Sequence, residues 1–191
     1  MGHAIFIGLY ELFISALVVL HNAAYYPPDF PTPVVNPTLA YPEIAITDVT
    51  GTDTENRRAR MAAILNNVVL ASDCFKYEVL NTDFSDTKGL TNQQIYDAFR
   101  TKVIEIEVVF FTGDHEQNEV EGLVGYYSVS TPHTIYQNRY VVGSAFASAS
   151  NMLHEVAHVL GFEHKKKIMI YSVPYQMNAI FKSCYFQMGM G

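Results

Sequence analysis

Four stretches of the chain alternate apolar with polar residues or run wholly apolar, and both patterns predict β-strands. The clearest is 102–111, where apolar residues alternate with Glu105 and Glu107 before the stretch becomes wholly apolar, as in a strand that enters a core. Turn residues at 130–132 separate the last two stretches. The predicted strands are 43–49, 102–111, 122–130 and 133–142.

Apolar residues recur every three to four positions in three further stretches, which predicts amphipathic helices. The longest is 55–80, and Thr54 is its expected N-cap because a threonine oxygen can accept a hydrogen bond from the first turn. A shorter helix is predicted at 92–100, with Thr91 in the same role.

The third helical stretch starts from a cap at Ser148 or Ser150 and is expected to stop at Gly161. A glycine there can adopt the left-handed conformation that closes a helix and turns the chain sharply. The apolar positions of this helix are Met152, Leu153, Val156, Ala157, Val159 and Leu160.

The chain begins with an apolar run at 4–20 that is interrupted only by Glu11 and is close to the shortest length that spans a bilayer. A signal peptide or a membrane anchor is one interpretation, and a helix packed on its own domain or on a partner is the other, because no basic residue precedes the run. Six of the eight prolines then fall within 27–42, which indicates an extended linker. The predicted organisation is a hydrophobic segment 1–24, a linker 25–42 and one folded domain 43–191.

Composition narrows the classes of function. A hydrophobic content of 49% with 16% charged residues suits a packed core, and a net charge of −7 disfavours nucleic acid as a partner. The one basic run, Lys165 to Lys167, is interpreted as a solvated turn. Cys74 and Cys184 lie far apart, so a single disulfide in an exported protein and two separate buried thiols both remain open.

The third predicted helix carries histidine and glutamate residues at a spacing that is typical of a metal site. His154 and His158 are four positions apart, about 40° around a helix, so both imidazoles project from one face. A catalytic zinc ion takes three protein ligands, and the turn at Gly161 allows His164 to swing back as the third. Glu155 would then face the open side of the metal and act as the general base for a water molecule.

The pattern H-E-x-x-H-x-x-G-x-x-H is matched at every fixed position by 154–164, and in this motif the chain resembles the metzincin metalloproteases. The resemblance implies a zinc-dependent endopeptidase, a hydrolase with Zn²⁺ as its cofactor. The apolar run at 4–20 favours a protein that is secreted or anchored in a membrane. It also implies an α+β fold: a twisted mixed sheet of four or five strands, a long backing helix, an active-site helix and a small C-terminal subdomain. A protein or peptide substrate would lie extended along an edge strand, expected at 125–130 or 134–140.

Metzincins also carry a methionine in a tight turn beneath the metal. Met169 is the favoured candidate here, although it follows His164 more closely than is usual in the family, and Met177 is the alternative. The sequence Ile-Met-x-Tyr resembles the turn of the astacin and serralysin branches, which implies that Tyr171 assists catalysis by stabilising an oxyanion. Tyr175 competes with Tyr171 for that role.

Two other functions stay open from the sequence. One is a binding protein that keeps the metzincin fold without turnover, and the other is an interaction protein tethered to a membrane through 4–20. His115 and His133 lie outside the motif and are interpreted as loop or strand residues, since three ligands already complete a catalytic zinc site.

Overall fold

The computed structural model describes residues 44–112, 124–164 and 169–190. The chain divides into two units, Met1–Leu39 and Ala40–Gly191, and the description concerns the second. The apolar run at 4–20, the proline-rich stretch, His115 and the lysine run lie outside the described residues. Among the described ranges, no helix is long and apolar enough to cross a membrane.

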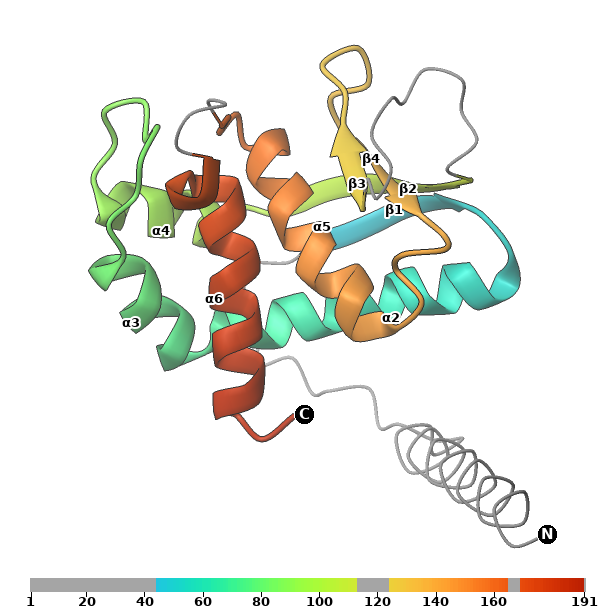
Figure 1. The fold of residues 1–191 in the computed structure, drawn as a ribbon, viewed down its shortest axis with the longest axis horizontal. Helices are drawn as coiled ribbons and strands as arrows, with labels where there is room; N and C mark the ends of the chain where they lie inside the picture. The colour runs from blue at the N-terminus through green and yellow to red at the C-terminus, as the bar shows by residue number, and fades with distance from the viewer. Residues whose placement is uncertain (1–43, 113–123, 165–168, 191) are drawn as a thin grey trace, which may run out of the picture. The chain divides into compact units, whose positions relative to one another are not determined.

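A four-stranded mixed sheet with strand order β1-β2-β4-β3 forms one layer of the fold (Figure 1). β1, β2 and β4 run parallel, whereas β3 pairs antiparallel with β4 and forms one edge of the sheet. Each strand matches one of the four stretches predicted from the alternation of apolar and polar residues, although β1 ends one residue later than predicted. The strands are β1 Ile44–Thr50, β2 Ile104–Phe111, β3 Gly125–Tyr127 and β4 Thr134–Asn138.

The predicted long helix is in fact two helices, α2 Asp53–Ala71 and α3 Asp73–Asn81. The break falls at Ser72, whose backbone is extended and whose side chain accepts a hydrogen bond from Phe75 N–H, so this residue starts a new helix. The expected cap at Thr54 is also wrong. Thr52 caps α2 in a reciprocal box with Glu55, and Thr54 lies inside the first turn.

The third predicted helix, α5 Ala145–Val159, begins earlier than expected because Ser144, not Ser148 or Ser150, is its N-cap. Ser148 is buried within the helix and donates a hydrogen bond of 2.6 Å to the Gln137 side chain. The helix predicted after Thr91 has the expected cap and bounds. The remaining helical elements are α4 Asn92–Arg100, the 3-10 turn η1 Met169–Tyr171 and α6 Val173–Gln187.

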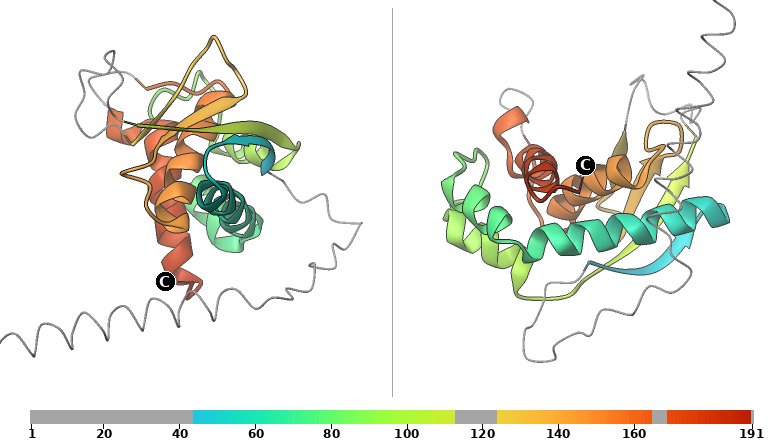
Figure 2. Two further views of the ribbon diagram at one scale, coloured as in Figure 1. Left: turned by 90° about the vertical axis from the view of Figure 1, so that its right-hand side faces the viewer. Right: turned by 90° about the horizontal axis from the view of Figure 1, so that it is seen from below.

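The helices α2 and α5 pack against one face of the sheet, and α6 packs on α5 (Figures 1 and 2). In β2 the residues on the helix side are buried, while Glu105 and Glu107 on the other face are exposed. The described part of the chain is therefore α+β, with a mixed four-stranded sheet and five α-helices, as expected at that level.

A disulfide joins Cys74 on α3 to Cys184 on α6, 110 positions apart. The sequence left open whether these cysteines are bridged, and the structure pairs them. The bond ties the C-terminal helix to the α3–α4 part of the core, where Phe75 and Phe99 are fully buried. It therefore restrains the helix that also carries residues of the site described below.

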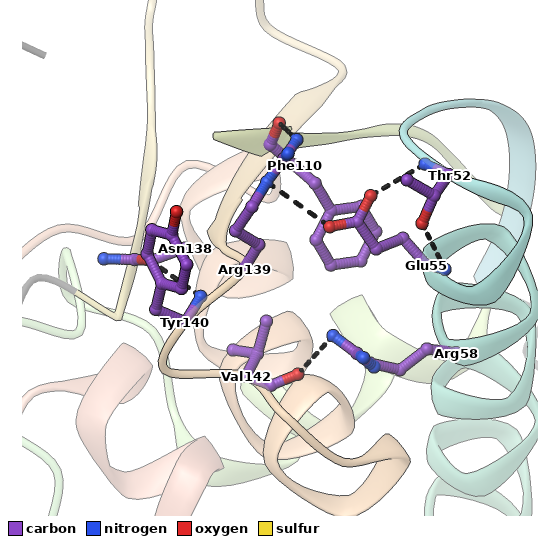
Figure 3. Close-up of polar contacts among 8 residues, drawn as sticks. All are labelled: Thr52, Glu55, Arg58, Phe110, Asn138, Arg139, Tyr140 and Val142. Atoms are coloured by element: carbon purple, nitrogen blue, oxygen red, sulfur yellow. Dashed lines mark hydrogen bonds and ion pairs between the residues drawn. The ribbon is translucent and has the colours of Figure 1, made fainter. Parts of the chain in front are cut away.

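A polar network fastens the start of α2 to the segment between β4 and α5 (Figure 3). The buried carboxylate of Glu55 accepts a hydrogen bond of 2.7 Å from Thr52 N–H, and its other oxygen lies 3.4 Å from Arg139 Nε. Arg139 also donates to the Phe110 carbonyl at 3.1 Å, and Arg58 donates to the Val142 carbonyl at 2.9 Å. Burial by itself raises the pKa of Glu55, but the bonds to Thr52 and the two arginines outweigh it and hold the pKa below its ordinary value.

Replacing Glu55 with glutamine is expected to reduce the free energy of unfolding at pH 7 by about 1–3 kcal/mol, because a charged acceptor is lost beside Arg139. Because the pKa is lower in the folded protein, this stabilisation is present above the unfolded value of 4.5 and is lost as the pH falls below it. Urea unfolding at pH 7 and pH 3 measures the change. Asp53→Asn, an exposed residue of the same first turn, is the matched control, and equal stability of Glu55→Gln and wild type at pH 7 would contradict the prediction.

Candidate metal centre and catalytic cavity

Three histidine rings converge at the C-terminal end of α5. His154 and His158, one helical turn apart, have ring centroids 5.2 Å apart. The ring of His164 lies 5.8 Å from the ring of His154 and 5.0 Å from that of His158. One ligand nitrogen from each ring lies within 4.8 Å of the others. In the described part of the chain this is the only group of His, Cys, Asp or Glu residues able to share a metal ion.

The chain reversal at Gly161 brings His164 back toward the helix. Gly161 has a φ of +91°, its N–H bonds the His158 carbonyl at 2.8 Å, and Phe162 N–H bonds the Ala157 carbonyl at 2.9 Å. This pair of bonds is the Schellman arrangement that closes a helix. The predicted role of Gly161 is therefore confirmed.

Phe162 holds this reversal in place and was missed in the sequence. Its side chain is buried and stacks on Phe99 of α4, with centroids 6.2 Å apart and planes 4° from parallel. An apolar residue directly after a helix-ending glycine commonly makes a hydrophobic contact of this kind, and that signal could have found it.

Backbone carbonyls orient two of the three rings. Nδ1 of His158 lies 2.7 Å from the Phe162 carbonyl oxygen, which leaves Nε2 free for a ligand. The ring of His154 is hydrogen-bonded to the Pro174 carbonyl at the start of α6. Metal-binding histidines generally donate their second ring N–H to such an acceptor, so both arrangements fit a metal site.

The electrostatics of the site keep two of these rings neutral. Burial is the largest cause that lowers the pKa of His154 to about 3, and the nearby His158 and His164 lower it further. Burial also lowers the pKa of His158, which outweighs its bond to the Phe162 carbonyl. Neutral imidazole is the form that binds a metal, so protons do not compete for these two nitrogens at neutral pH.

Glu155 lines the same cavity and is 3% exposed. Burial raises the pKa of its carboxyl to about 8, so the group is protonated at neutral pH in the metal-free protein. A cation held by the neighbouring histidines would favour the ionised form, because opposite charge lowers the pKa of a carboxyl group. The residue is thus placed to give and take a proton near pH 7.

The cavity has a volume of about 330 Å³ and extends from the histidines to the edge strand β3. Besides the histidines and Glu155, it is lined by Gly125, Tyr126 and Tyr127 of β3 and by Tyr175 of α6. Of the two predicted edge segments, 125–130 contains the edge strand, whereas β4 lies inside the sheet between β2 and β3.

Gly125 allows β3 to lie close to α5. A Cβ atom at this position would lie 2.3 Å from Asn151 Nδ2 and 2.5 Å from the Tyr136 carbonyl oxygen, so a larger residue would push the strand away. On the next position of β3, the ring of Tyr126 stacks on Tyr136 with centroids 4.4 Å apart. Both contacts fix the edge strand at the border of the cavity.

The two tyrosine candidates occupy different places. Tyr175 lies in the cavity, with its ring centroid 4.7 Å from that of His154 and 5.3 Å from that of His164. Tyr171, the residue favoured from the sequence, is not among the residues that line this cavity; it lines a separate recess and is 54% exposed. Of the two candidates, Tyr175 is therefore the one that lies in the cavity with the histidines.

The two methionine candidates also differ. Met169 begins the 3-10 turn η1, where its carbonyl accepts a hydrogen bond of 2.6 Å from the Ser172 hydroxyl. Met177 lies inside α6 and is fully buried in the core. Met169 is thus the candidate that occupies a tight turn, and its place beneath a metal stays a prediction. His133 is exposed and belongs to no metal-binding group of the described residues.

Three imidazole nitrogens suit zinc, which prefers nitrogen and sulfur ligands and leaves a fourth position open in catalytic sites. Zinc–nitrogen bonds are about 2.0–2.1 Å long, and the three candidate nitrogens lie within 4.8 Å of one another. Comparisons with protein-family models, with curated proteins and with solved structures find no match to the chain.

Proposed function

We propose that this chain is a zinc-dependent endopeptidase of the metzincin type. The observation that carries the proposal is the convergence of His154, His158 and His164 beside the buried Glu155, in a cavity lined by β3, the edge strand of the described sheet. A structural role for the histidines alone would not require a carboxyl group with a raised pKa at the same place.

A zinc ion bound by the three histidines would act as a Lewis acid and lower the pKa of water to about 7. Glu155 accepts the proton from the attacking water and passes it to the nitrogen of the leaving amine. Tyr175 lines the cavity beside the histidines, where its phenol group would donate a hydrogen bond to the oxygen that becomes negatively charged.

The edge strand β3 provides the means to hold an extended peptide. Asn138 N–H donates to the Val124 carbonyl at 2.9 Å, and hydrogen-bonded and free positions alternate along an antiparallel pair. Gly125 and Tyr127 therefore direct their N–H and C=O groups away from β4, toward the free edge. A substrate strand would pair with these groups and lie across the histidines.

Export is part of the proposal. The Cys74–Cys184 disulfide supports an oxidising compartment, because such bonds are rare in reducing ones. We propose that the protein is secreted or anchored in a membrane, with the apolar run at 4–20 as the targeting or anchoring segment.

The test combines metal analysis with peptide cleavage. We expect one zinc ion per wild-type chain, cleavage of unfolded casein, loss of cleavage with a chelator and recovery when zinc is returned. His158→Ala should lose both zinc and cleavage, whereas His133→Ala, which changes an exposed histidine outside the site, should keep both.

The alternatives give different results in the same experiment. Bound zinc without cleavage of any peptide in a broad library would identify a catalytically silent binding protein. Equal cleavage with and without the chelator would contradict the metal-dependent mechanism.

A further inference from the structure

A second recess lies beside the loop between α3 and α4. It has a volume of about 200 Å³ and is lined by Asp83, Phe84, Ser85 and Tyr171. The function proposed above does not use it. Tyr171, which the sequence predicted to assist catalysis beside the metal, lies in this recess.

Backbone bonds hold the two walls of this recess together. Ser85 N–H donates to the Tyr171 carbonyl at 2.8 Å, and Ser85 and Ser172 form a short parallel bridge. At the base of the loop, the Asn92 side chain donates to the Thr82 carbonyl at 2.8 Å. The recess is therefore formed before any ligand arrives, which lowers the entropic cost of binding.

The recess and the histidine cavity are lined by residues of one short segment, Tyr171 and Tyr175 respectively. Tyr171 lies four residues before Tyr175, whose ring is 5.3 Å from the ring of His164. The Cα atoms of Tyr171 and Tyr175 are therefore at most about 14 Å apart, and an extended substrate that runs alongside this segment would cover that distance in about four residues.

The lining has the chemistry of a site for a cationic side chain with an apolar stem. Tyr171 presents a half-exposed ring, Phe84 is partly buried, and Asp83 adds an exposed carboxylate. Aromatic faces attract ammonium and guanidinium groups, and the net charge of −7 attracts basic peptides from a distance. We propose that this recess binds a lysine or arginine side chain located within four residues of the cleaved bond, an inference that rests on the proposed endopeptidase function.

The experiment uses the zinc-loaded full chain and pairs of synthetic peptides that place either lysine or uncharged norleucine at each of the four positions on either side of the cleaved bond. At one position we expect kcat/KM to be about fivefold higher for lysine than for norleucine. Asp83→Asn should bring that ratio close to one and leave cleavage of the norleucine peptides unchanged. Asp48→Asn, which removes the same charge from the exposed edge of β1, should keep the wild-type ratio.

The outcomes separate the two proposals. Cleavage of both peptides with equal kcat/KM at every position, or a lysine preference that survives in Asp83→Asn, would overturn the subsite and leave the endopeptidase intact. Cleavage of neither peptide would contradict the endopeptidase, and the subsite that depends on it falls as well.

Discussion

Substitution of Glu155 by glutamine is expected to lower kcat by about 10²- to 10⁴-fold while zinc stays bound, because glutamine keeps the size of the side chain but cannot accept a proton. Glu155 is adjacent to His154 yet is not one of the three converging ligands, so its loss should leave the metal in place. Peptide turnover together with zinc content measures both effects. Unchanged kcat would contradict the role of Glu155, and loss of zinc would indicate that the residue supports the ligands instead.

The same substitution should stabilise the metal-free protein at alkaline pH. The pKa of Glu155 is raised from 4.5 to about 8 on folding, so the unfolded chain releases its proton first and stability is lost as the pH rises through this range. Glutamine does not titrate, and the variant should therefore be more stable than wild type at pH 8 by about 4 kcal/mol, with little difference near pH 4.

Urea unfolding in the presence of a chelator at pH 4, 6 and 8 checks this pH dependence. Glu105→Gln, on the exposed face of β2, is the matched control and should show no stabilisation that grows with pH. If the Glu155→Gln variant gained no stability between pH 4 and pH 8, the carboxyl group would not be held protonated by its surroundings. Replacement of a functional residue often stabilises a protein, because the burial and geometry that its function needs are unfavourable for folding.

Short-range sequence patterns predicted most of the helices and strands. The apolar and polar alternation of β2 depends only on which face of the strand is buried, and the capping box of Thr91 and Gln94 lies within four residues. The prediction of one continuous helix was wrong at Ser72, because the apolar spacing continues across the break. Only the hydrogen bond that Ser72 accepts from Phe75 N–H shows that a new helix starts there. The helix α6 was not predicted.

In the site, too, local spacing predicts some residue positions and tertiary packing determines the others. His154 and His158 share a helix face by their spacing alone, so their proximity could be predicted. The approach of His164 depends in addition on the packing of Phe162 against Phe99, which is far from it in sequence. The choice between Tyr175 and Tyr171 depends on where α6 begins, and no spacing within the motif contains that information.

Removal of the disulfide is expected to have the largest effect on stability. The double variant Cys74→Ala/Cys184→Ala should lose about 3–5 kcal/mol of unfolding free energy, because a bridge across 110 positions removes much of the conformational freedom of the unfolded chain. Urea unfolding of the metal-free protein, with and without a thiol reductant, measures the loss.

The reductant separates the bond from the packing of the sulfur atoms. Cys184 is fully buried, so its replacement by alanine leaves a small cavity that costs stability even without a bridge. The reductant should therefore lower the unfolding free energy of the wild-type protein and leave that of the double variant unchanged. If it destabilised neither, the bridge would not form in solution. Because α6 also carries Tyr175 and the Pro174 carbonyl that orients His154, the weakened protein should in addition bind zinc less tightly, which would connect the bridge to the metal centre.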